Sequence, residues 1–317
     1  MHREQTAPLE AERTRGGRAG LDVVPLSQHI GAEIRGVDLA SDLDQATVGA
    51  IRDALLQWKV VFFRDQELSR DAHVAFGARF GEVTPAHPTL PSRFPERPEI
   101  LALEAESHGH DPEDSILEQR WHSDVTYVEA PPLGSILRAV QVPPYGADTE
   151  WTNLAAAYAS LSEPVRSMID GLHAVHHNVL HLVRGEPTPL MRAFQAKRLR
   201  ALHPVVTVHP ETGERILYVN PDYTSHIVEL TRRESGHLLA CLNEHLAGRE
   251  LTVRVHWEPG TVAFWDNRST AHLAPADVPA GYQRLMERIT LAGTRPVGVN
   301  GFVSYALDEP GAHANGS

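Results

Sequence analysis

Residues 253–265 read VRVHWEPGTVAFW, two short apolar runs separated by Glu258-Pro259-Gly260. The runs Val253–Trp257 and Thr261–Trp265 are rich in β-branched and aromatic side chains, which is typical of β-strands. Proline followed by glycine marks a tight turn between them. The stretch therefore predicts a β-hairpin.

Similar runs recur on both sides of this stretch. Further strands are predicted at residues 60–63, 136–140, 205–208, 216–219 and 288–292, and residues 210–213 (PETG) mark the turn of a second hairpin. Helices are predicted at residues 44–59, 69–81, 153–161 and 231–248, the last opening with a capping box. Short strands with few helices between them predict a mainly β fold with flanking helices, built as an antiparallel sheet pair or a barrel.

Composition and charge exclude several classes of protein. The chain has 317 residues, 42% of them hydrophobic, and a formal net charge of −12 without a long Lys/Arg run, which argues against a nucleic-acid partner. No apolar stretch approaches the roughly 18 residues of a membrane span, and residues 1–20 lack the apolar segment of a signal peptide. Cys241 is the single cysteine, so no internal disulfide can form. We expect a cytoplasmic homo-oligomer that binds no membrane.

The composition along the chain also predicts how it is divided into domains. Residues 1–20 are polar and rich in Arg and Glu, and we expect a disordered leader there. Residues 21–300 show no internal repeat and no break in composition, which predicts one domain. We expect residues 301–317 to form a mostly flexible tail.

The nineteen histidines justify a search for a metal site. In Trp121-His122-Ser123-Asp124, a strand would place His122 and Asp124 on one face, where both could bind one ion. The pair His256/Glu258 is a competitor, since it has the same spacing at the end of a strand. A 2-His-1-carboxylate triad needs a second imidazole, and His272 follows a strand and a polar turn. Such a site leaves coordination positions open for substrate, O2 or water.

Two arginines follow His272 at close spacing. If residues 284–288 (RLMER) are extended, Arg284, Met286 and Arg288 share one face, and the two guanidiniums lie about 13 Å apart. Two buried cations would require two anionic groups in the cavity. A helix would instead place both arginines at one anion, and a solvated surface patch is the third interpretation.

These motifs together resemble the taurine dioxygenase (TauD/TfdA) family of Fe(II)/2-oxoglutarate-dependent oxygenases over roughly residues 21–296. The stretches that carry the resemblance are IGAEIRGVDL (30–39), VVFFR (60–64), RFG (79–81), WHSDVTY (121–127), GADT (146–149), WDNR (265–268) and RLMER (284–288). The resemblance implies a double-stranded β-helix (jelly roll) as the fold. It also implies Fe(II) as the metal, with 2-oxoglutarate and O2 as co-substrates.

The resemblance assigns roles to individual residues. His122, Asp124 and His272 match the iron ligands, and Arg284 with Thr149 matches the groups that hold the distal carboxylate of 2-oxoglutarate. The residues that match the substrate pocket are His87, Val125 through its backbone N–H, Arg288, Trp257 and Trp265. Arg288 would receive the anionic head of a small substrate, so that the carbon beside a sulfonate, as in taurine or another alkylsulfonate, is hydroxylated and collapses to an aldehyde and sulfite.

Several pocket positions depart from taurine-using members. Glu118 stands where those enzymes tend to carry Asn, Leu90 replaces a frequent Tyr, and residues 220–223 read NPDY in place of Asn-x-Phe. Residues 178–202, which would form a lid over the pocket, match poorly. An alkyl sulfate ester or an aryloxy carboxylate would therefore also suit Arg288 beside Leu90.

Two functions from other classes remain open at this point. A hydrolase could use Zn²⁺ at the same three residues, and a jelly-roll binding protein could retain them without catalysis. Neither needs a dicarboxylate site, so Arg284 with Thr149 favours the oxygenase. A second metal site among His173, His176, His177 and His181 lacks an ordered ligand spacing.

Overall fold

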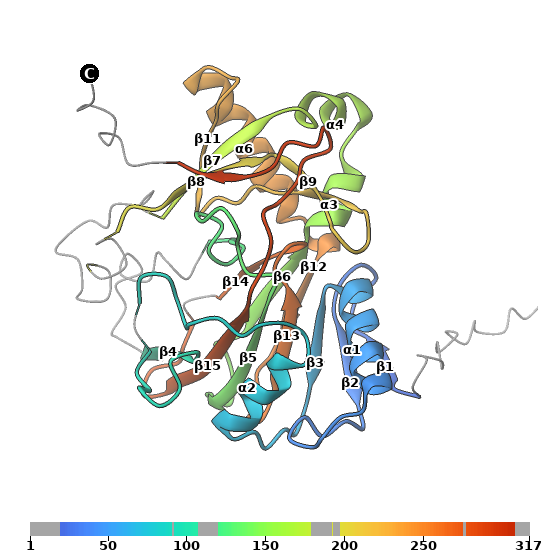
Figure 1. Cartoon of the computed structure of the whole chain (residues 1–317), viewed down its shortest axis with the longest axis vertical. Helices are drawn as coiled ribbons and strands as arrows, with labels where there is room; N and C mark the ends of the chain where they lie inside the picture. Colours follow the sequence, from blue (N-terminus) through green and yellow to red (C-terminus); the bar gives the residue numbers. More distant parts are fainter. Residues whose placement is uncertain are drawn as a thin grey trace, which may run out of the picture.

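The computed structural model describes residues 20–90, 92–106, 120–178, 192, 197–274 and 277–307 (Figure 1). The predicted leader up to residue 19, Glu118, residues 308–317 of the predicted tail and most of the predicted lid lie outside these ranges. Within them, no helix is long and apolar enough to cross a membrane.

Two sheets face each other and form the centre of the molecule (Figure 1). The larger sheet has the strand order β1 (Asp22–Pro25), β2 (Ala32–Arg35), β3 (Val60–Phe63), β13 (Val262–Asp266), β5 (Gly134–Gln141), β15 (Gln283–Leu291), β4 (Leu101–Glu106). The smaller sheet has the order β12 (Thr252–Val255), β6 (Thr149–Asn153), β14 (Thr270–Leu273). Neighbouring strands are antiparallel except β2 and β3, which run parallel.

Alternate side chains of β3 pack against the smaller sheet on one face and against the first two helices on the other. Val60 and Phe62 point between the two sheets, where Phe62 packs edge-on against Trp151 of β6 with 5.3 Å between ring centroids. Val61 and Phe63 point to the opposite face and join the core beneath the first two helices. The strand is therefore buried on both faces, as its continuous apolar run indicates. The sandwich confirms the predicted jelly roll.

The predicted helices are all present. Helix α1 (Gln45–Trp58) begins after Asp44 and α2 (Arg70–Ala78) after Ser69, and each of these side chains accepts a backbone N–H of the first turn. Both helices cover the outer face of the larger sheet (Figure 1). Helix α3 (Leu154–Ser160) follows β6 directly, and α6 (Arg232–Leu246) begins with the capping box of Thr231. The described residues also include helix α4 (Glu163–Ile169) and the 3₁₀ helix η1 (Arg249–Leu251).

A second group of strands packs with α3 and α6 above the sandwich (Figure 1). Its larger sheet has the order β11 (Thr224–Ile227), β7 (His173–His177), β8 (Arg200–Pro204), β16 (Tyr305–Ala306). The hairpin β9 (Val206–Val208) and β10 (Arg215–Leu217) confirms the turn predicted at residues 210–213. Strand β16 pairs with β8, so two residues of the stretch expected to be a mostly flexible tail lie in a sheet.

The predicted hairpin at residues 253–265 is wrong. Strand β12 pairs with β6 in the smaller sheet, whereas β13 pairs with β3 and β5 in the larger one. The intervening turn therefore crosses between sheets. Gly260 has a φ of +76°, and a Cβ there would lie 3.0 Å from the backbone oxygen of Gln66, so the turn requires glycine at this position. The turn chemistry was identified correctly, but turn residues alone do not specify which strands pair.

Candidate metal centre and its surroundings

The three predicted metal ligands lie close together between the sheets. Each of His122, Asp124 and His272 offers one ligand atom, and these three atoms lie within 4.8 Å of one another. His272 belongs to β14, and its main chain forms a two-way bridge with His122, with N···O distances of 3.0 and 2.7 Å. The Nε2 of His272 lies 4.0 Å from the Oδ1 of Asp124. Residues separated by about 150 positions in the chain thus form one cluster.

The local geometry differs from the predicted strand. His122 forms only an isolated bridge with His272, and residues 124–127 form a turn. Val125 in that turn has a φ of +58°, a left-handed conformation that is an outlier for a β-branched residue. The turn, rather than strand alternation, brings Asp124 beside His122. Sequence periodicity carried no signal for this turn.

The electrostatic surroundings suit a divalent metal ion. Burial would raise the pKa of Asp124, but Arg288 and the two histidines hold it well below its usual range, so the carboxylate is ionised. Burial, with a contribution from His122, lowers the pKa of His272 to about 3, so its imidazole is neutral and can bind a metal. The Nδ1 of His122 lies 2.9 Å from the carbonyl oxygen of Arg120, which leaves Nε2 for a metal. Two imidazoles and one carboxylate fit the donor set of a facial triad.

Both arginines of β15 point inward and are 7% exposed, so the surface-patch interpretation is wrong. The Nη2 of Arg284 donates to the hydroxyl of Thr149 at 3.3 Å. The Nη1 of Arg288 donates to the Oδ1 of Asp124, and the Nε of Arg288 has no partner among the described residues. Met286 between them packs into the core between the sheets. The predicted shared face of residues 284, 286 and 288 is confirmed.

Thr149 receives two hydrogen bonds in this arrangement. The indole Nε1 of Trp257 donates to its hydroxyl oxygen at 2.9 Å, in addition to Arg284. Because a hydroxyl accepts two bonds and donates one, the proton of Thr149 can be directed to an anion beside Arg284. Trp257 was assigned above to the substrate pocket, but it contacts Thr149, which was matched to the 2-oxoglutarate site. Trp265 lies beside His272, with 5.0 Å between ring centroids.

His87 lies at the edge of the cluster with a defined tautomer. The backbone N–H groups of Thr89 and Leu90 donate to its Nδ1 at 3.2 and 3.1 Å, so the proton is on Nε2, which lies 2.9 Å from the hydroxyl of Tyr127. Burial and the charge of Arg288 lower the pKa of His87 to about 4. Tyr127 carried no signal of this role in the sequence, and its ring lies 5.0 Å from that of Tyr223 between centroids.

The competing metal sites are not supported, because in the described part of the chain only His122, Asp124 and His272 form a group of three ligand side chains close enough to bind one ion. His256 instead contacts Asp148, with 2.9 Å between Nδ1 and Oδ1, and Glu258 is exposed. His176 is fully buried between two threonine hydroxyls, those of Thr126 and Thr224.

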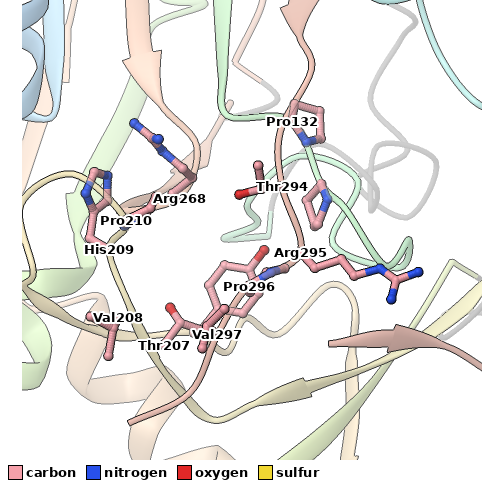
Figure 2. A pocket seen from close by; sticks show the side chains of 12 residues that line it. Pro132, Thr207, Val208, His209, Pro210, Arg268, Thr294, Arg295, Pro296 and Val297 are labelled. Carbon is pink, nitrogen blue, oxygen red and sulfur yellow. The ribbon is translucent and has the colours of Figure 1, made fainter. Parts of the chain in front are cut away.

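A separate pocket borders the turn between β13 and β14 (Figure 2). It is lined by residues 131–132, 207–210, 218, 268 and 294–297. None of the three cluster residues belongs to this lining, so the pocket is distinct from the candidate metal centre.

Comparison with known proteins identifies the family. The model of the family "Taurine catabolism dioxygenase TauD, TfdA family" matches residues 22–290. The chain belongs to this family. TauD/TfdA proteins are dioxygenases that depend on α-ketoglutarate, which is 2-oxoglutarate, and the family implies O2 and iron as its partners in the reaction. The chain is thus an enzyme of this class, and the hydrolase and binding-protein alternatives are not supported.

Individual TauD/TfdA proteins are similar over nearly the whole chain. An α-ketoglutarate-dependent sulfate ester dioxygenase from Pseudomonas putida is 44% identical over 300 residues, which covers 90% of this chain and 93% of that protein. An alkylsulfatase from Acinetobacter baylyi is 37% identical over 291 residues, covering 89% and 88%. The crystal structure of a taurine dioxygenase from Burkholderia xenovorans has a TM-score of 0.77 and 47% identity, covering 91% and 97%.

Proposed function

We propose that this dioxygenase binds Fe(II) at His122, Asp124 and His272 and hydroxylates the carbon next to a sulfonate group. The observation that carries the proposal is the placement of two buried arginines, Arg284 and Arg288, on the inward face of one strand beside the three ligands. One arginine serves each of two anions, the co-substrate and the substrate. When bound, iron with 2-oxoglutarate supplies the oxidation of a C–H bond, with release of succinate and CO2.

The co-substrate end is formed by Arg284 and Thr149. The guanidinium and the threonine proton together donate to the distal carboxylate of 2-oxoglutarate, and such charge-assisted bonds are short and strong. The bond from Trp257 holds the threonine oxygen so that its proton is directed to the carboxylate. The role of these residues is to fix the co-substrate by its far end and to direct its keto-acid end toward the ligand cluster.

The substrate end is formed around Arg288. Because Arg288 contacts Asp124, an anion that it binds lies next to the metal ligands. We assign the backbone N–H of Val125 and the imidazole of His87 as two further groups that contact this anion, because Val125 follows Asp124 in the left-handed turn and the charge of Arg288 acts on His87. The buried anion orients the adjacent carbon, so selectivity arises from positioning. The hydroxylated carbon then releases sulfite as its C–S bond breaks, and its hydroxyl loses a proton to become the aldehyde.

A sulfate ester is the second candidate substrate. Two similar relatives, the sulfate ester dioxygenase and the alkylsulfatase, carry the names of activities on sulfate esters. The same positioning by Arg288 would lead to hydroxylation of the carbon that bears the sulfate oxygen. The C–O bond to sulfate would then break, and the products would be an aldehyde and inorganic sulfate.

Substrate-triggered O2 uptake separates these candidates. Matched alkyl sulfonates, alkyl sulfates and aryloxyacetates are supplied with Fe(II) and 2-oxoglutarate, and sulfite, sulfate and phenol are quantified against succinate. Sulfite release in proportion to succinate supports the first proposal, and sulfate release alone supports the second. Phenol as the only product would contradict both. Arg288→Ala should form succinate slowly without oxidising the substrate, and full coupling in that variant would contradict the role of Arg288.

A further inference from the structure

The turn between β13 and β14 contacts the ligand loop through one buried amide. The Oδ1 of Asn267 accepts the backbone N–H of Asp124 at 2.6 Å, and its Nδ2 donates to the backbone oxygen of Asp124 at 3.0 Å. The same Nδ2 donates to the backbone oxygen of Pro132 at 3.1 Å. Asn267 is 0% exposed, so these bonds are made away from water. One side chain thus binds both main-chain groups of a proposed metal ligand, 143 positions away in the chain.

The chemistry of these contacts requires an amide. Bonding to an N–H and to two carbonyl oxygens requires one acceptor and two donors on the same short side chain. Aspartate of the same shape accepts from the N–H but directs a negative charge at two carbonyl oxygens. Serine is too short to bridge both groups and offers a single proton. Only an amide of this length meets all three partners of Asn267.

These bonds act on a strained segment of the chain. Val125 follows Asp124 directly in its left-handed conformation, which is unfavourable for a β-branched residue. On the other side of Val125, the Nε2 of His203 donates to the backbone oxygen of Thr126 at 2.7 Å. The segment is therefore held on both sides of the strained residue, by Asn267 and by His203.

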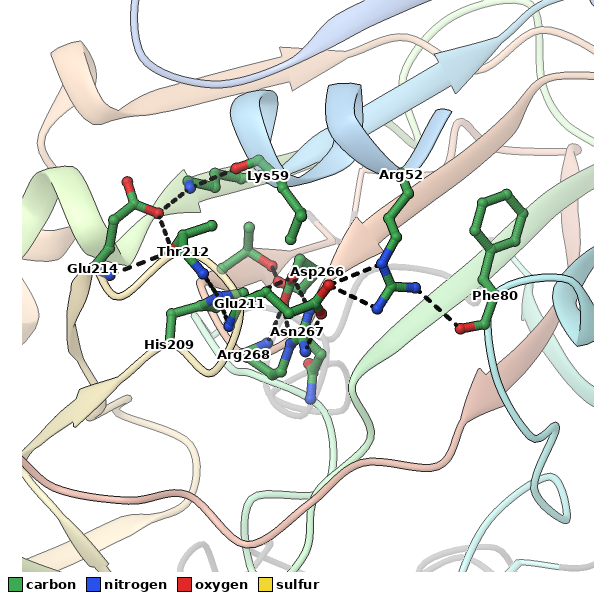
Figure 3. A network of polar contacts seen from close by, with 12 residues as sticks. Arg52, Lys59, Phe80, His209, Glu211, Thr212, Glu214, Asp266, Asn267 and Arg268 are labelled. Atoms are coloured by element: carbon green, nitrogen blue, oxygen red, sulfur yellow. Dashed lines mark hydrogen bonds and ion pairs between the residues drawn. The ribbon is translucent and has the colours of Figure 1, made fainter. Parts of the chain in front are cut away.

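The turn that carries Asn267 is itself fixed from outside the cluster. Asp266 accepts hydrogen bonds from the Nε2 of His209 at 3.0 Å and from the guanidinium of Arg268 at 2.6 and 2.9 Å (Figure 3). The Nη1 of Arg268 donates to the carboxylate of Glu211 at 2.8 Å, and the Nε of Arg52 in α1 donates to the same carboxylate at 2.8 Å. Asp266 and His209 are buried. The turn is thus attached to the β9–β10 hairpin and to helix α1.

The same turn also determines where His272 lies. The hydroxyl of Ser123 donates to the backbone oxygen of Thr270 at 2.7 Å, two residues before His272. The segment from Asn267 to His272 therefore contacts both sides of the cluster, since Asn267 bonds to the main chain of Asp124 and β14 carries His272.

We propose that Asn267 is a positioning residue that sets the spacing of the metal cluster by fixing the main chain of Asp124 to the turn that delivers His272. The inference rests on the metal centre of the proposed function. Asn267 touches neither metal nor substrate and acts through the position of Asp124 and the turn at Val125. Side chains that orient metal ligands typically change metal affinity by 10–100-fold when they are altered.

The test is an anaerobic titration of the full-length protein with Co(II), followed by its visible absorption, together with the melting temperature of each metal-free variant. Asn267→Asp should raise the Co(II) dissociation constant by 10-fold or more and alter the band shape. Asn153→Asp is the matched control, because Asn153 is also a buried amide that accepts from main-chain N–H groups and donates to a main-chain oxygen, that of His29. This control should keep the Co(II) affinity of the wild type.

The possible outcomes separate the two proposals. If the wild type binds no Co(II), or binds it equally well after Asp124→Ala, the proposed metal centre is wrong. If the wild type binds Co(II) at Asp124 and Asn267→Asp has a lower melting temperature but an unchanged dissociation constant and spectrum, the positioning role is overturned. Should Asn267→Asp fail to fold, Asn267→Ser introduces no buried charge and should show the same loss of affinity; unchanged affinity in that variant overturns the inference equally.

Discussion

Arg284→Ala should weaken the binding of 2-oxoglutarate far more than any loss of an exposed arginine. Arg284 is 7% exposed and meets the hydroxyl of Thr149, so water screens its interaction with a carboxylate only weakly. Leaving a buried charge without its partner costs about 3–5 kcal/mol. The lower value corresponds to a dissociation constant raised about 150-fold. Arg284→Lys keeps the charge but loses the planar fork, and it should recover part of this loss.

The assay is an anaerobic titration of the Fe(II) protein with 2-oxoglutarate, followed by the visible charge-transfer band of the complex. Arg35→Ala is the control, because it removes the same charge at a side chain that is 56% exposed, and its dissociation constant should match that of the wild type. The reasoning would be refuted if Arg284→Ala bound 2-oxoglutarate within threefold of the wild type. It would also be refuted if the Arg35 control lost affinity equally.

Three further predictions concern the cluster and the core. Asp124→Ala should abolish succinate formation, since it removes the only carboxylate of the cluster, and residual turnover above the metal-free background would contradict this. Glu287→Gln should lower the free energy of unfolding by about 2–3 kcal/mol in urea, because the buried carboxylate pairs with Arg70 and Arg138; a change below 0.5 kcal/mol would disprove it. Stability should fall as the pH drops from about 6.5 to 4, because burial lowers the pKa of His73 to about 4 and the unfolded chain takes up the proton first. This loss amounts to about 3 kcal/mol, and His73→Leu should reduce the pH dependence measured by urea unfolding.

The sequence predicted the elements whose signals are local. The capping box at Thr231 was readable because N-cap chemistry acts within a few residues. The inward face of β15 was readable because side chains alternate with a period of two, which placed Arg284 and Arg288 together. Spacing made His272 a candidate for the third ligand, and the motif resemblance then matched it to an iron ligand of the family.

The parts that were missed depend on contacts between distant segments. Two strands flanking the Pro-Gly turn at residues 259–260 belong to different sheets, and a turn signal carries no information on pairing. The left-handed Val125 has no sequence signature, because only the contacts around Asp124 and Thr126 stabilise it. Asn267 likewise gave no sign of its partner, which lies 143 residues earlier. Tertiary contacts decide such features, and one sequence does not reveal them.

The most direct test of the metal centre is the anomalous scattering of a crystal grown with Mn(II), a redox-stable substitute for Fe(II), and 2-oxoglutarate. A single strong peak is predicted at about 2.0–2.3 Å from one atom each of His122, Asp124 and His272. The distal carboxylate of 2-oxoglutarate should then lie against Arg284 and Thr149. A peak bound elsewhere, for instance between His256 and Asp148, or a metal without His272 among its ligands, would contradict the account.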